Sequence, residues 1–261
     1  MYRFLPGIAR PKDADFLRRY MSFEKFVSLL GTKSLFFTRA DKFEDPFEGF
    51  MPPSVRSIYE SEANSFESND LRKSIAKWRK YILCSCWHHG NEESAAMWEK
   101  YHMHNSGIAI KTTVGNFKNC LGEGYNVFIG KIKYINHYEY EVPQNLPEKS
   151  IYTWYFHKRK PFEYEREFRA IIAHYPSFLR DYIDNEGNLI SPKTILNRDF
   201  PDICEIGMPF DIDVNTLISE VITSPYTDDW VTDTVRSVVK QYGFDFDVNP
   251  SPLLKEPSET V

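Results

Sequence analysis

The chain has 261 residues, of which 42% are hydrophobic and 16% aromatic, and its formal net charge is −5. This length and composition exclude a disordered chain and are sufficient for a sizeable core. The acidic balance argues against a general phosphate-backbone binder, which needs a basic face to displace counterions, although a local basic patch stays open.

The first residues and the cysteines bear on the compartment. The N-terminal stretch MYRFLPGIARPKD lacks the layout of a signal peptide, and no run of about eighteen apolar residues exists. We therefore expect a cytoplasmic protein without a membrane partner. The four cysteines are too few and too irregularly spaced for a disulfide framework, so free thiols are expected at Cys84, Cys86, Cys120 and Cys204.

The first fifty residues predict a strand, a helix, a second strand and a turn. Residues 1–5 are typical of a short strand, and apolar residues at helical spacing predict a helix over 22–31, with Ser22 as N-cap and Gly31 as stop. SLFFTRA predicts a strand, and the DKFEDPFEGF box after it contains Asp45-Pro46, which cannot continue a helix.

The middle of the chain alternates helices with short strands. Residues 51–69 are polar and are expected to be irregular or weakly helical, whereas the apolar residues in LRKSIAKWRKYIL recur at helical spacing ahead of a strand, ILCSCW. A helix over ESAAMWEKYH, a strand over SGIAIKT and a strand over VFIGKIKYI follow.

The last third predicts a helix over 151–160, a strand over EFRAIIAHY, and a strand, turn and amphipathic helix from ISEVIT to KQYG. The elements alternate without βαβ regularity, which favours an α+β fold. We expect a single domain over residues 1–245, with a mixed or antiparallel β core, in one arrangement two packed sheets, flanked by helices. Residues 246–261 are expected to be a flexible tail.

The stretch KPFEYEREFRAII places charges at the start of an apolar strand. On an extended chain Glu165, Glu167 and Arg169 would share one face, because side chains alternate. Two like charges so placed repel each other unless a cation is near. The stretch therefore predicts either a solvent-exposed salt ladder or a functional pair of carboxylates.

A second box, EDPFEG, combines a rigid proline with two acidic residues. Phe47 can anchor the turn, and Asp45 and Glu48 can cap backbone amides or present carboxylates. A structural turn and a chemical role both stay open.

The histidines suggest a metal site only weakly. His88, His89, Glu92 and Glu93 lie close in sequence, with His102 and His104 further on, but no HExxH motif is present. We therefore favour no metal. Trp98 and Tyr101 lie three apart on one helix face, which is typical of core packing and also suits a stacking platform.

Taken in order, these boxes resemble a bacterial and phage-associated family recorded as a domain of unknown function. The resemblance rests on EDPFE, where the family more often has Asn in place of Glu44, on MWEKY ahead of a Gly-led strand, and on YEREFR. It covers about Tyr2 to Tyr242 and implies a family rather than an activity.

A second resemblance supplies a mechanism. ADP-ribosyltransferases of the arginine–serine–glutamate type carry an Arg on the first strand, a Ser on a middle strand and a Glu-x-Glu before a later strand, and this sequence has Arg3, Ser85 and Glu165-Arg166-Glu167 in that order. The resemblance implies that Arg3 and Ser85 hold NAD, that Glu167 stabilises the positive charge left as nicotinamide departs, and that Glu165 activates the acceptor. Trp98 or Tyr101 would stack on a base.

The resulting hypothesis is an NAD-consuming transferase or glycohydrolase that acts on a nucleic acid or protein acceptor, as a toxin or in phage defence. One alternative is a metal-dependent nuclease or phosphoesterase that uses Asp45, Glu48, His88 and Glu167. Another is a non-enzymatic sensor or interaction module, in which aromatic residues line a groove.

Overall fold

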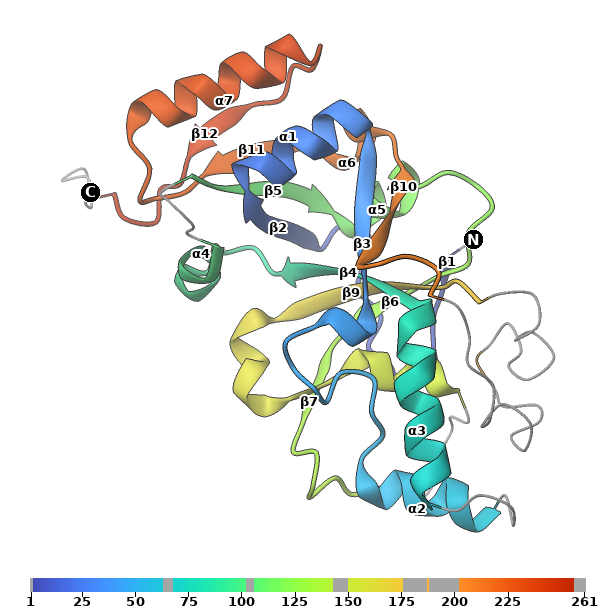
Figure 1. Cartoon of the computed structure of the whole chain (residues 1–261). Coiled ribbons are helices and arrows are strands. Elements are labelled where there is room, and N and C mark those ends of the chain that lie inside the picture. The colour runs from blue at the N-terminus through green and yellow to red at the C-terminus, as the bar shows by residue number, and fades with distance from the viewer. Residues whose placement is uncertain are drawn as a thin grey trace. The chain divides into compact units, whose positions relative to one another are not determined.

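The computed structural model describes residues 2–62, 68–101, 106–142, 150–175, 187 and 202–255. The described residues form helices, a large mixed β-sheet and a small two-stranded sheet (Figure 1), which confirms the α+β class. The chain divides into two compact units, each assembled from three segments. The first unit comprises Met1–Arg10, Phe36–Cys86 and Gly124–Met208, and the second comprises Pro11–Leu35, Trp87–Glu123 and Pro209–Val261.

The strands of the first unit lie in the order β1-β6-β9-β4. Strand β1 is parallel to β6 and β6 is antiparallel to β9, so Arg3, Phe128 and Ile171 lie side by side and share one face of the sheet. The bounds are β1 (Tyr2–Arg3), β6 (Val127–Lys131), β9 (Glu167–Ala173) and β4 (Ile82–His89). Strand β3 (Ser34–Arg39) pairs with β4 at Thr38 and Cys84, and the small sheet consists of β7 (Lys133–Ile135) and β8 (His157–Arg159), which are parallel.

One face of these strands forms the core of the first unit. Cys84, Phe128 and Ile171 pack there against Trp78 at the end of α3 and against the aromatic residues of the 3-10 segment η4. The helical elements of this unit are η1 (Ala40–Lys42), α2 (Pro53–Glu62), α3 (Ser68–Trp78), η2 (Arg79–Tyr81), η4 (Ile151–Phe156) and η5 (Lys160–Glu165).

The second unit is built on the strand order β4-β2-β5-β11-β12. Strand β5 is antiparallel to both β2 and β11, and β12 is parallel to β11. Tyr20, Ala109 and Ile222 of these strands pack with Met97 and Trp98 of α4. The remaining elements are β2 (Phe16–Ser22), α1 (Phe23–Thr32), α4 (Ala95–Tyr101), β5 (Gly107–Thr113), α5 (Val114–Cys120), β10 (Gly207–Asp211), α6 (Val214–Leu217), β11 (Glu220–Thr223), α7 (Asp229–Gln241) and β12 (Val248–Pro250).

Most predicted elements are present, and the differences have physical reasons. The segment FLRRYMS, which was not predicted, forms β2 because its neighbours β4 and β5 supply hydrogen-bond partners on both sides. Pro53–Glu62 is a helix, which is one of the two predictions for this polar segment, irregular or weakly helical. Residues 151–160 form a 3-10 turn followed by β8, because backbone pairing with β7 competes with the helix. In the predicted tail, Val248–Pro250 pairs with β11.

Within the residues that the structure describes, no helix is both long enough and apolar enough to cross a membrane.

Candidate functional site

The first unit contains a buried cluster of charges centred on Arg169. This guanidinium is fully buried, and its five N–H groups are all engaged. Nε and Nη2 donate to Glu167 at 2.6 and 3.0 Å, Nη1 and Nη2 donate to Glu48 at 2.7 and 3.1 Å, and Nη1 also donates to the carbonyl of Tyr155 at 2.7 Å. Such bidentate pairing is the strongest geometry that Arg offers a carboxylate.

Lys158 joins a third carboxylate to this cluster. Its ammonium forms a short ion pair with Glu165 and lies 3.3 Å from Glu167 and 3.4 Å from Glu48. Glu165 and Glu167 are 6% and 4% exposed, so they do not form the solvent-exposed ladder that was one of the two predictions. We call Glu48, Lys158, Glu165, Glu167 and Arg169 the ion cluster.

The alternation of side chains along a strand does not explain why Glu165 and Glu167 both reach Lys158. Glu165 ends the 3-10 segment η5, and Arg166 adopts the left-handed conformation with φ of 42° before β9 begins at Glu167. The prediction of an extended 165–169 stretch was therefore wrong at Glu165. The sharp turn at Arg166 leaves that side chain exposed and still brings both carboxylates to Lys158.

The EDPFEG box forms the turn that delivers Glu48. Asp45 accepts a hydrogen bond from the Phe47 amide at 3.0 Å and pairs with Arg159 at 2.8 Å, which is the capping role expected of it. Gly49 has φ of 73°, and a Cβ there would lie 2.4 Å from the ring of Tyr155, so only glycine fits.

The charges within the ion cluster set its protonation. Burial would raise the pKa of Glu167, but Arg169 and Lys158 outweigh it and lower that pKa to about 2. Burial would lower the pKa of Lys158, but Glu167 and Glu48 raise it above its usual value. The cluster therefore brings three carboxylates together with two cations in the interior of the first unit.

The predicted NAD-holding residues are brought together only in part. Arg3 is in register with Phe128 and Ile171, on the sheet face that also carries Glu167, and strand spacing places it about 16 Å from Glu167. Ser85 is buried on β4 between Cys84, which packs in the core on that face, and Cys86, which hydrogen-bonds to Glu167. Because side chains alternate, Ser85 faces away from Glu167.

Trp98 and Tyr101 belong to the second unit. Trp98 is fully buried, packs edge-on against Tyr20 and donates from Nε1 to Glu93 at 2.7 Å. Tyr101 is half-buried and stacks with Tyr20 at a ring-centroid distance of 6.4 Å. Both residues therefore take part in the core packing that their spacing also predicted.

The histidines that suggested a metal site have other surroundings. His88 is buried in β4 with its ring 6.0 Å from that of Tyr20, and His89 Nε2 lies 3.0 Å from Asp15. His102 and His104 lie outside the described residues. Among the residues the structure does describe, no group of three or more His, Cys, Asp or Glu side chains could hold a metal ion.

Three residues of the site were missed by sequence reasoning. Lys158 links the carboxylates, Cys86 hydrogen-bonds to Glu167, and the hydroxyl of Tyr134 accepts from the Glu167 amide at 2.8 Å. The basic run HKRK directly before the glutamate box was the available signal for Lys158, because closely placed carboxylates require a nearby cation.

In comparisons with known proteins, no protein-family model, no curated protein and no solved structure matches this chain.

Proposed function

We propose that the protein is an NAD-consuming transferase or glycohydrolase, active in the cytoplasm, whose reacting carboxylates are Glu165 and Glu167. The observation that supports the proposal is the convergence of three buried carboxylates, Glu48, Glu165 and Glu167, on Lys158. When the bond between nicotinamide and ribose breaks, positive charge develops on the ribose, and a preorganised buried anion stabilises it.

The roles follow from the surroundings of each carboxylate. Glu167 stays ionised because its pKa is low, so it stabilises the ribosyl cation. Glu165 accepts a proton from water or from the acceptor hydroxyl as that oxygen attacks the ribose, and the electron pair of the broken bond leaves with nicotinamide. Arg3 lies on the same sheet face and pairs with the pyrophosphate, whereas Ser85 has no part in this arrangement.

The same proposal includes membership of the family with the (N/E)DPFE, MWxxY and YExE(F/W)R boxes. Two of these boxes supply four of the five residues of the ion cluster, because Glu48 belongs to EDPFE and Glu165, Glu167 and Arg169 belong to YEREFR. A nucleic acid or a protein is the proposed acceptor, and toxin action or phage defence the proposed setting.

The proposal is tested by measuring nicotinamide release from labelled NAD. Wild type should release nicotinamide with and without a nucleic acid or protein acceptor, and Glu165→Gln and Glu167→Gln should each lower the rate by at least about 100-fold. Glu163→Gln is the matched control, because Glu163 is exposed in the same η5 segment. Release by Glu167→Gln at the wild-type rate would disprove the assigned role.

A second candidate is a non-enzymatic interaction module in which the ion cluster is purely structural. It is favoured by the full engagement of Arg169 and by the 4% exposure of Glu167, which leave little room for a substrate. In this case wild type releases no nicotinamide, and Glu167→Gln lowers thermal stability without changing any turnover. Measuring both quantities on the same variants separates the two candidates.

A further inference from the structure

The second unit contains a hollow of about 620 Å³ that the proposed function does not use. Its walls come from β2, β5, β11 and β12, from the loop at residues 91–93 and from the segment after β12. A volume of this size is typical of sites that enclose a small molecule. We call it the β2–β12 pocket.

A buried arginine lies in the wall of this pocket. Arg18 is 5% exposed, and main-chain carbonyls fix its guanidinium: Nη1 donates to Gly90 and Glu92 at 2.8 and 3.1 Å, and Nη2 donates to Asn91 at 2.5 Å. Within the described part of the chain, its Nε has no hydrogen-bond partner and no carboxylate lies within ion-pair distance. A buried charge normally requires such a partner.

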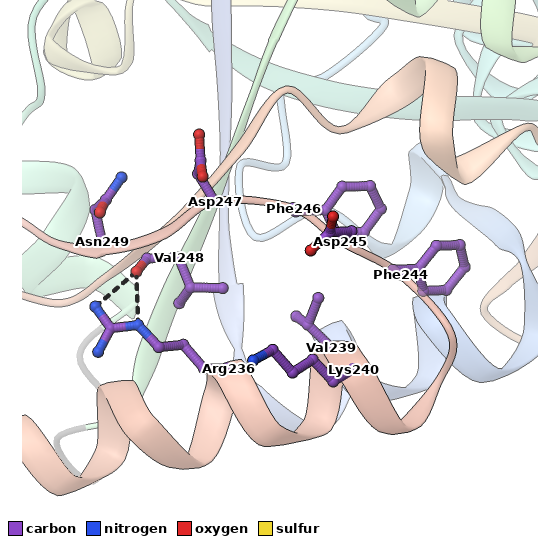
Figure 2. A pocket seen from close by; sticks show the side chains of 9 residues that line it. All are labelled: Arg236, Val239, Lys240, Phe244, Asp245, Phe246, Asp247, Val248 and Asn249. Atoms are coloured by element: carbon purple, nitrogen blue, oxygen red, sulfur yellow. Dashed lines mark hydrogen bonds between the residues drawn. The ribbon is translucent and has the colours of Figure 1, made fainter.

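In several other arginines of this chain, the edge of the guanidinium formed by Nε and Nη2 donates hydrogen bonds to an acceptor. The same edge holds Asp41 at Arg39, Asp45 at Arg159 and Glu167 at Arg169. At Arg236, in a second and smaller hollow, Nε and Nη2 both donate to the carbonyl of Val248, as the dashed lines of Figure 2 show. The same edge of Arg18 therefore has the geometry to bind a carboxylate, but no carboxylate of the described residues lies there.

Charges across the pocket indicate the rest of the ligand. Arg18, Lys111 and Glu220 are neighbours in register on adjacent strands, and Lys111 pairs with Glu220 at 2.9 Å. Asn249 also donates to Glu220, at 3.0 Å. The lining residues balance in charge, with three cations and three carboxylates: Arg18, Lys111 and Lys255 against Glu92, Glu93 and Glu220. Ile222, Pro250, Pro252 and Leu253 add apolar surface.

We propose that the β2–β12 pocket binds a small zwitterion of the amino-acid type. Its carboxylate pairs with the Nε and Nη2 edge of Arg18 and with Lys111, its ammonium group faces Glu220, and its side chain lies against the apolar wall. A doubly charged phosphate fits less well, because three carboxylates lie in the same wall. The Nε atom is buried in this structure, so binding requires a movement that exposes it.

Isothermal titration of the 261-residue chain with each L-amino acid, with acetate and with inorganic phosphate tests the proposal. At least one amino acid should bind, acetate should bind more weakly, and phosphate should not compete. Arg18→Lys keeps the charge and removes the fork, so it should weaken binding at least about tenfold. Arg236→Lys is the matched control and should bind as wild type does, because the Arg236 edge already holds a carbonyl.

Several results would overturn the proposal: no amino acid binds to wild type, phosphate binds as well as the amino acids, or Arg18→Lys retains wild-type affinity. If circular dichroism shows that Arg18→Lys is unfolded, Lys111→Met gives the same test from the other cation, with loss of binding expected. The inference is independent of NAD consumption, because no residue of the ion cluster lines this pocket.

Discussion

At the scale of single residues, the ion cluster holds more charge in the interior than a typical core does. Arg169 faces two carboxylates, and its guanidinium also lies over the ring of Phe43 at 5.4 Å. Burying such ions costs free energy that their mutual attraction roughly offsets, so an intact cluster adds little net stability. Removing one member has a much larger effect, because it leaves its partners buried without a counter-charge.

Arg169→Met should therefore lower the free energy of unfolding by about 3–5 kcal/mol, as measured by urea denaturation. Among the described residues, the substitution leaves Glu48 and Glu167 paired with Lys158 as the one remaining cation. Arg166→Met is the matched control, because Arg166 is exposed three residues away, and it should change stability by less than about 0.5 kcal/mol. Equal effects of the two substitutions would contradict the structural importance of the cluster.

At the scale of secondary-structure elements, the end of α1 shows how local geometry departs from the sequence signal. Gly31 was predicted to stop the helix, but α1 continues to Thr32 and Lys33 takes the left-handed conformation with φ of 49°. A Cβ on residue 31 would lie only 3.2 Å from the ring of Tyr242, which gives that glycine a packing role instead. Helices commonly end with glycine at the position that Lys33 occupies.

Lys33→Gly should stabilise the protein by up to about 1 kcal/mol, because glycine adopts positive φ without the cost that other residues incur. Lys25→Gly provides the opposite control. Lys25 is exposed inside α1, where glycine should destabilise by about 1 kcal/mol. Chemical denaturation should show a higher free energy of unfolding for Lys33→Gly and a lower one for Lys25→Gly. A loss of stability in Lys33→Gly would show that Lys33 is not strained by its left-handed conformation.

At the scale of the whole molecule, stability should depend on pH in two separate ranges. Burial lowers the pKa of His157 to about 4 from an ordinary value of 6.5, although the carbonyl of Thr153, 2.9 Å from Nδ1, opposes the change. The unfolded chain therefore takes up this proton first, and stability falls as pH drops from 6.5 to 4. The depressed pKa of Glu167 adds a second loss between 4.5 and about 2.

Unfolding free energies measured from about pH 7.5 to about pH 3 should decline through both ranges in wild type. His157→Gln should make the decline shallower in the upper range alone, and Glu167→Gln should make it shallower in the lower range alone. His174→Gln is the control for the upper range, because His174 is exposed. An unchanged slope in His157→Gln between pH 6.5 and 4 would show that this histidine is not held neutral by the fold.

The sequence predicted individual elements better than their assembly. Apolar spacing is a local property, so β3, β9 and α7 could be read directly from SLFF, FRAII and the WVTDTVRSVV stretch. Strand β2 was missed because FLRRYMS has no clean alternation, and its two neighbours come from residues far along the chain. No local pattern indicates that each compact unit draws on three separate segments.

The α+β class, the EDPFEG turn and the close placement of two carboxylates around position 166 could be predicted from the sequence alone, because these features depend on residue type and short-range spacing. The burial of the glutamates, their contact with Lys158 and the orientation of Ser85 away from Glu167 could be seen only in the folded chain. The fold also places Arg18 in the wall of a pocket. Burial and charge pairing depend on which distant segments of the chain come into contact, and local sequence patterns do not specify those contacts.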